Sequence, residues 1–182
     1  ENPPFVLEFC ENGFAGDYPC SNYDLIGHID LTTLGGNSGN DCWGWTDPSS
    51  GKEYALMGLN SGTSFIDISD LEFPRIIGFL PTHTTNSSWR DIKTYGNYAF
   101  IVSEASGHGM QVFDLTKLGN LAVDSPSVTF TEDAHYSGFG RAHNIVINEA
   151  QGYAYAVGTN TYNGGPHFID ISSPLNPLAA GG

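Results

Sequence analysis

Three short segments carry the residues best suited to chemistry. They combine Trp, Arg, Asp, His and Asn at matching places in a repeated pattern: Trp43-Gly44-Trp45, Trp89-Arg90-Asp91 and Ala142-His143-Asn144. If each segment opens the first strand of its repeat, the three converge although they lie far apart in the sequence. Such a mixture predicts a polar pocket with aromatic walls. In the alternative interpretation, tryptophan packs between repeats, and Asp and Arg pair with each other.

The candidate ligand-binding residues share a place at this expected meeting point or in the loops beside it. They are Trp45, Trp89, Arg90, Asp91, His108, His143 and Asn144. Nitrogen and oxygen donors among them suggest a metal site formed by Glu104, His108 and His143. Their spacing matches no short zinc motif such as HExxH, and the competing interpretation is structural histidines held by hydrogen bonds.

A calcium site is a separate hypothesis for the divalent metal. Oxygen-rich loops around Asp41, Asp47 or Asp133 offer suitable ligands, but the sequence contains no calcium-loop consensus. Nucleophilic catalysis has no signature either: there is no GxSxG elbow, no reactive-cysteine context and no phosphate-binding glycine loop. These absences favour binding over catalysis without deciding the question.

Two recurring sequence motifs predict the strands that position these residues. FIDIS at 65–69 returns as VFDLT at 112–116 and as FIDIS at 168–172. Ahead of them, Tyr-Ala pairs begin at residues 54, 98 and 153, so the steps are 44 and 55 residues. Steps of this size are typical of propeller blades with four strands each. The sequence therefore predicts an all-β fold, a β-propeller of which about three four-stranded blades are seen.

The repeat divides the chain into an N-terminal segment, 1–40, and three blades at 41–84, 85–136 and 137–182, the last of them incomplete. The Asp that recurs in the second phrase, at 67, 114 and 170, is expected to accept hydrogen bonds from the following turn. A catalytic role for this Asp is the less favoured alternative.

The N-terminal segment contains a further hint of blade structure. Residues 24–29 (DLIGHI) resemble 75–80 (RIIGFL), the expected outer strand of the first blade. An outer strand without a blade of its own would complete the last blade of a ring and remove exposed sheet edges. Because three blades do not close a ring, we expect the chain to form the opening part of a larger one.

The amino-acid composition limits the classes of binding partner and indicates the cellular compartment. Six Lys and Arg oppose 20 Asp and Glu, a formal net charge of −14, which disfavours nucleic acid and anionic membrane as partners. No apolar run is long enough to span a bilayer. Cys10 and Cys20 bracket a short loop that a disulfide can close, Cys42 is left over, and Asn86 begins a glycosylation sequon. We therefore expect a secreted or cell-surface glycoprotein.

Four stretches together resemble one family. They are CENGFAGDYPC, WGWTDPSSGKEYALMGLNSGTSFIDIS, WRDIKTYGNYAFIVSEASGHGMQVFDL and AHNIVINEAQGYAYAVG, which cover most of residues 10–175. The chain resembles the choice-of-anchor B family of secreted proteins, built from LVIVD-type propeller repeats. The resemblance implies a signal peptide before residue 1, further blades after Gly182 and a C-terminal surface anchor. Cys42 departs from the family pattern, and the resemblance implies no enzymatic activity.

Three functions remain open at this stage. The favoured one is an extracellular binding, adhesion or scaffold module whose partners are other extracellular proteins or surface glycans. The second is a metal-dependent hydrolase or lyase with its site around His143, Asp91 and His108. The third is a structural subunit that self-assembles into an extracellular filament or layer.

Overall fold

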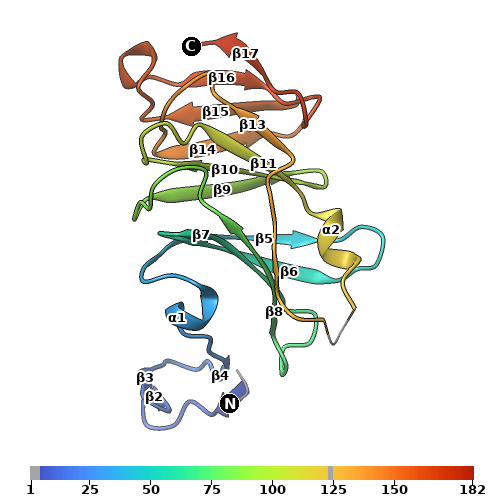
Figure 1. The fold of residues 1–182 in the computed structure, drawn as a ribbon. Coiled ribbons are helices and arrows are strands. Elements are labelled where there is room, and N and C mark those ends of the chain that lie inside the picture. The colour runs from blue at the N-terminus through green and yellow to red at the C-terminus, as the bar shows by residue number, and fades with distance from the viewer. Residues whose placement is uncertain (1–4, 123–124) are drawn as a thin grey trace.

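Three antiparallel sheets stack face to face, and a small N-terminal segment precedes them (Figure 1). The computed structural model describes residues 5–122 and 125–182; residues 1–4 and 123–124 fall outside this account. Helices are limited to single turns: α1 (Leu31–Leu34), α2 (Thr116–Gly119) and the 3-10 turn η1 (Tyr162–Gly164). The prediction of an all-β protein is therefore confirmed.

Each sheet is built on a meander of three or four consecutive strands that are hydrogen-bonded neighbours. The first sheet contains β5 (Gly39–Thr46), β6 (Glu53–Leu59), β7 (Gly62–Asp67) and β8 (Arg75–Pro81), with β12 (Val128–Thr129) parallel to β8 at its edge. The second contains β9 (Arg90–Tyr95), β10 (Tyr98–Ser103), β11 (Met110–Asp114) and β13 (Ala134–Tyr136). The third contains β14 (Asn144–Asn148), β15 (Tyr153–Val157), β16 (His167–Asp170) and β17 (Leu178–Gly181).

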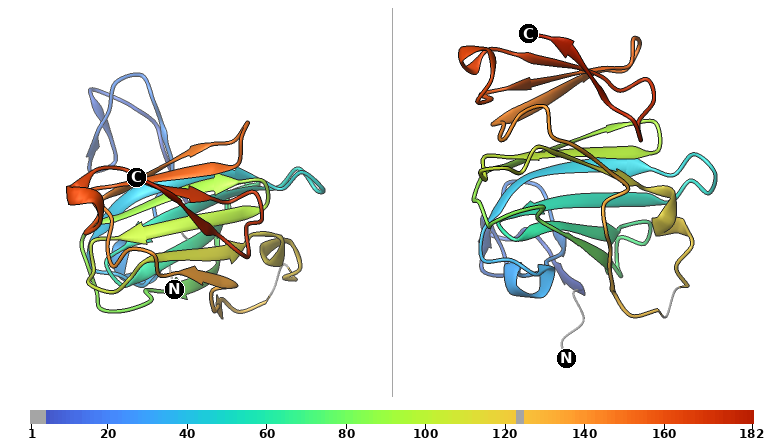
Figure 2. Two further views of the ribbon diagram at one scale, coloured as in Figure 1. Left: turned by 90° about the horizontal axis from the view of Figure 1, so that it is seen from above. Right: turned by 45° about the horizontal axis from the view of Figure 1, so that its top comes forward.

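The first strands of the three sheets lie beside one another. β9 contacts β5 on one side and β14 on the other, so these strands share one edge of the stack (Figure 2). Because the meanders repeat, residues far apart in the sequence meet along this edge. The convergence predicted from the repeat thus holds for the strands themselves.

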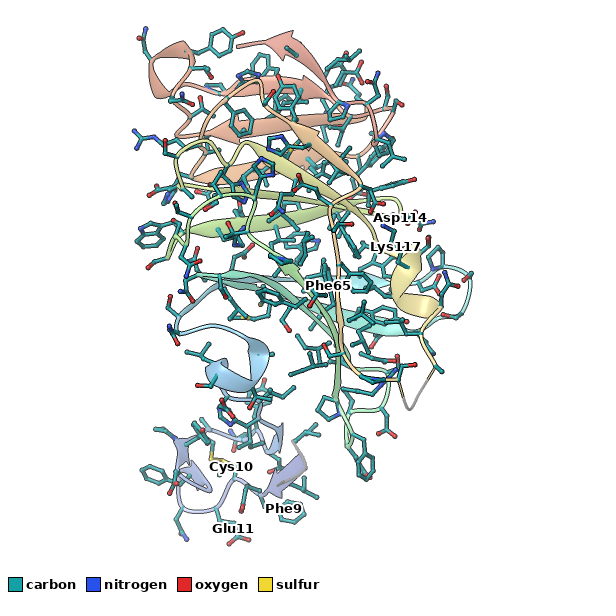
Figure 3. All side chains as sticks on the ribbon, in the orientation of Figure 1. Phe9, Cys10, Glu11, Phe65, Asp114 and Lys117 are labelled. Atoms are coloured by element: carbon teal, nitrogen blue, oxygen red, sulfur yellow. A yellow bond between two sulfur atoms is a disulfide. The ribbon has the colours of Figure 1, made fainter. Side chains whose placement is uncertain are left out.

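The sheets are held together by side chains that alternate along each strand. Leu56 and Phe65 are fully buried between the first and second sheets, where Phe65 stacks on Phe113 at a centroid distance of 4.7 Å (Figure 3). Phe100 and Val112 point from the opposite face of the second sheet into the interface with the third. A strand with both faces covered carries apolar residues at consecutive positions, which explains phrases such as NYAFIV.

The recurring Asp ends the third strand of every sheet and caps the turn that follows. Asp67, Asp114 and Asp170 each accept a hydrogen bond from the backbone N–H two residues ahead, at 3.0, 3.0 and 2.9 Å. This is the geometry of an Asx turn. The predicted structural role of these residues is confirmed.

The N-terminal segment forms two small hairpin-like pairs joined by a disulfide. β1 (Phe5–Glu8) pairs with β4 (Leu25–Gly27), β2 (Phe14–Ala15) pairs with β3 (Tyr18–Pro19), and Cys10 is bonded to Cys20 as predicted. The expected outer strand at 24–29 therefore has a partner in β1 and pairs with none of the three sheets. It still lies against the first sheet: Ile26 and Ile29 line an apolar groove of about 320 Å³ together with residues of the sheet, among them Cys42, Ala55, Met57, Ile66 and Ile68.

No helix within 5–122 and 125–182 has the length and apolar character needed to cross a membrane. Cys42 is exposed and carries a free thiol.

Candidate functional site

Two carboxylates join the first strands across the sheet interfaces. Asp41 on β5 accepts a hydrogen bond from the backbone N–H of Ile92 on β9, at 2.9 Å. Asp91 on β9 repeats this contact with the N–H of Ile145 on β14, at 2.7 Å. The side chain of each strand thus accepts a hydrogen bond from a backbone N–H of the next strand and links the two strands across the sheet interface.

Asp91 is saturated with hydrogen bonds. It is 3% exposed; one oxygen accepts from Lys93 Nζ at 2.5 Å, and the other accepts from Asn144 Nδ2 at 3.2 Å as well as from Ile145. Burial alone would raise the pKa of Asp91, but hydrogen bonds from the Asp41 carboxyl, whose own pKa is raised by burial, and from the Lys93 ammonium outweigh burial and hold the pKa of Asp91 below its ordinary value. Asp91 is therefore an ionised structural group without a free lone pair for a ligand.

Arg90 and His108 form a second buried pair. Arg90 is 1% exposed; its Nε donates to the carbonyl of Leu59 at 3.0 Å, and its Nη1 lies 3.1 Å from His108 Nε2. Because guanidinium can only donate, His108 is the acceptor and is neutral. Burial, reinforced by the Arg90 charge, lowers the pKa of His108 to about 4, and burial lowers the pKa of Arg90 to about 10. This pair lies inside the molecule and offers no open face to a substrate.

An exposed cluster gathers at the end of the stack where β9 and β14 begin. Trp89 immediately precedes β9, and His143 immediately precedes β14; their rings are 5.6 Å apart between centroids. Glu104 follows β10, and its Oε1 lies 2.6 Å from His143 Nδ1. Trp89 is 51% exposed, and the other two side chains are also open to solvent. We call these three residues the Trp89 cluster.

Trp45 does not take part in this cluster, which corrects the prediction. It lies opposite Tyr54 in the β5–β6 register, as Tyr95 lies opposite Tyr98 in the β9–β10 register. Trp45 therefore corresponds to Tyr95, at the other end of the strand from Asp91. Its indole is buried and donates to the carbonyl of Gly96 at 3.1 Å. The prediction misplaced Trp45 because six residues separate β5 from β6, whereas two residues separate β9 from β10; counted from these turns, Asp41 corresponds to Asp91.

The predicted metal ligands are divided between two places. Glu104 and His143 are paired, whereas His108 is enclosed with Arg90, so the three donors do not converge. The calcium hypothesis finds no shared site either. Each carboxylate is engaged by donors of its own surroundings. Asp41 accepts from Ile92 N–H, Asp47 from the hydroxyls of Ser49 and Ser50, and Asp133 from Lys117 and from Asp114 N–H.

A different group of donors does converge: His83, Glu132 and His135. The prediction missed this group because its residues lie outside the repeated motifs.

Comparison with protein-family models, with curated proteins and with solved structures found no match to this chain.

Proposed function

We propose that the chain is a non-catalytic, extracellular binding module of propeller type that recognises surface glycans through the Trp89 cluster. The disulfide and the excess of acidic groups fit a protein outside the cell. In this proposal the three sheets are blades, and β5, β9 and β14 are their inner strands. The repeated meanders and the repeated carboxylate link between first strands support this assignment. Membership of the choice-of-anchor B family belongs to the same proposal.

The observation that carries the proposal is the chemistry of the exposed cluster. A pyranose ring presents C–H groups on its face and hydroxyls at its rim. The half-exposed indole of Trp89 offers an apolar face, while Glu104 offers carboxylate acceptors and His143 a second ring nitrogen beside it. Because the cluster stands on the ends of rigid strands, its geometry is held in place before a ligand arrives.

The hydrolase alternative is less well supported by the same geometry. Of its three proposed residues, Asp91 has every lone pair engaged, and His108 is 0% exposed. Only His143 faces solvent, so the three residues do not converge on one metal ion that could activate a water molecule. The surroundings of Asp91 and His108 are those of residues that hold strands together.

A glycan array probed with the labelled 182-residue chain tests the proposal. We expect a defined subset of glycans to bind, and we expect the Trp89→Ala variant to lose at least about tenfold in affinity for them, since about 1.4 kcal/mol corresponds to roughly 60 Å² of lost apolar contact at about 25 cal/mol per Å². Tryptophan fluorescence titration with a bound oligosaccharide gives the affinity.

Trp43→Ala is the matched control. Trp43 is a partly exposed indole on β5 that lies under Lys93 Nζ, 4.4 Å from its ring centroid, outside the cluster. Its replacement should leave glycan affinity unchanged. Absence of binding on the array, or equal loss in both variants, would contradict the proposal.

A further inference from the structure

Three donor side chains meet at the outer seam between the first and second sheets. His83 follows β8, His135 lies within β13, and Glu132 lies in the segment that joins β12 to β13. Their ligand-type atoms all lie within 4.8 Å of one another. His83 Nδ1 is 2.8 Å from Glu132 Oε1, and the rings of the two histidines are stacked at 3.7 Å, so one ring must turn for both in-plane lone pairs to reach the same ion. The segments are brought together by the parallel pairing of β12 with β8.

His135 is held in the protonation state that a metal ion requires. Its Nε2 lies 2.7 Å from the backbone carbonyl of His108. A carbonyl can only accept, so Nε2 carries the hydrogen and Nδ1 keeps its lone pair. A ligand histidine whose second nitrogen donates to a carbonyl is the usual arrangement around protein-bound metals.

Unsatisfied oxygen atoms surround the same place. Glu132 Oε2 is buried and has no hydrogen-bond partner, and the same is true of Thr82 Oγ1 and Gln111 Oε1. Gln111 is 2% exposed, lies opposite His135 in the β11–β13 register, and donates through Nε2 to the carbonyl of Pro81 at 3.0 Å. A buried carboxylate oxygen without a donor is costly, and a bound cation would satisfy it.

The donor set identifies the class of ion. Two imidazoles and one carboxylate are ligands for zinc and similar divalent transition metals, and they leave a fourth position open. Calcium prefers a shell of oxygen atoms, which two imidazoles do not provide. His83 is partly exposed and gives an ion access from solvent.

We propose that His83, Glu132 and His135 form a binding site for a divalent transition-metal ion such as Zn²⁺, which ties the end of β8 to β13. The ion would replace the hydrogen bond between His83 Nδ1 and Glu132 Oε1. Because it would join the edges of two sheets, its main effect would be to stabilise their contact. This site is distinct from the Trp89 cluster and does not depend on glycan binding.

Isothermal titration calorimetry with ZnCl₂ on the chelator-treated 182-residue chain tests the site. The measurement uses a Cys42→Ser background, so that the exposed thiol cannot supply a ligand. We expect one ion per chain and a higher Tm in the presence of zinc. His135→Ala and the conservative Glu132→Gln should each weaken binding at least about tenfold. Co²⁺ in place of zinc should give the visible absorption of a four-coordinate site, lost in the same variants.

His28→Ala provides the matched control, since His28 is an exposed histidine of the N-terminal segment. Circular dichroism without metal establishes that each variant is folded, and Glu132→Gln preserves the shape of the side chain if His135→Ala does not fold. No zinc binding by the folded parent chain would overturn the proposal. So would affinity that survives in Glu132→Gln or falls equally in His28→Ala.

Discussion

Asp91 shows how one side chain can hold two sheets in register. Its carboxylate lies on β9, yet its hydrogen bonds reach Lys93 on the same strand and both Asn144 and Ile145 on β14. Removing the charge would leave Lys93 without its closest anionic partner and the Ile145 N–H with a weaker acceptor. The contribution of Asp91 to the free energy of unfolding can therefore be measured by substitution.

Asp91→Asn should lower the free energy of unfolding by about 2–3 kcal/mol at neutral pH, because a buried, charge-assisted set of hydrogen bonds is disrupted. Urea unfolding followed by tryptophan fluorescence measures this loss. The folded-state pKa of Asp91 is lowered, so its contribution is present above the unfolded-state pKa of about 4 and is lost as the pH falls through the lower folded value. The difference between wild type and variant should accordingly shrink in acid.

Asp17→Asn serves as the surface control, since Asp17 is an exposed residue of the N-terminal segment. It should change the free energy of unfolding by less than about 0.5 kcal/mol. If Asp91→Asn were equally mild at neutral pH, the carboxylate would not be holding the strands together.

The strands could be predicted from the sequence, whereas the register between them could be predicted only in part. The motifs around Tyr54 and Phe65 marked neighbouring strands because the face that these strands bury against the second sheet leaves a consistent apolar pattern. Trp45 was misplaced because the turn between β5 and β6 has six residues and the turn between β9 and β10 has two, so tryptophans that look equivalent in the sequence lie at opposite ends of their strands.

The His83–His135 contact was beyond prediction for a different reason. It depends on β12 crossing from the second repeat to the edge of the first sheet, where Val128 pairs with Gly78. Gly78 permits this approach, since a Cβ there would lie 2.1 Å from the ring of Phe130. A two-residue strand outside the repeated phrases carries too little pattern to be assigned from sequence.

The N-terminal segment is expected to behave as a separate element. Its strands are two to four residues long, and the Cys10–Cys20 bond closes a loop that contains little buried surface. Reduction with dithiothreitol should therefore loosen the chain around this loop and leave the three sheets folded. Limited proteolysis with mass spectrometry should show new cleavage between residues 9 and 24 at an unchanged main Tm.

Cys10→Ser/Cys20→Ser, kept under non-reducing conditions, is the control for effects of the reductant itself and should reproduce the cleavage pattern. A large fall in the main Tm would instead mean that the disulfide loop stabilises the sheets.

At the scale of the whole structure, the described residues leave the outer face of the third sheet open to solvent. On the outer face of the third sheet, Val146 lies opposite Tyr155, which in turn lies opposite Phe168. Val146 is 56% exposed. The same positions of the second sheet are covered by the third, so this face has the character of an interface, while the net charge of −14 opposes self-association.

Added salt should therefore promote self-association of the chain, because it screens the repulsion between copies. Sedimentation velocity at low and high NaCl concentration measures this effect, and Val146→Glu should keep the chain monomeric at high salt. Tyr23→Glu, which changes an exposed side chain far from this face in the sequence, should not. A chain that stays monomeric under all conditions would show that the face remains solvated.

The groove between β4 and the first sheet has a practical consequence through Cys42. This residue is the one cysteine of the three outside the disulfide, and it lines the groove beside Ile26 and Ile66. Its thiol is therefore a single, built-in attachment point for a maleimide dye or spin label. The rate at which it reacts would report whether the groove is open or covered, with no substitution in the protein.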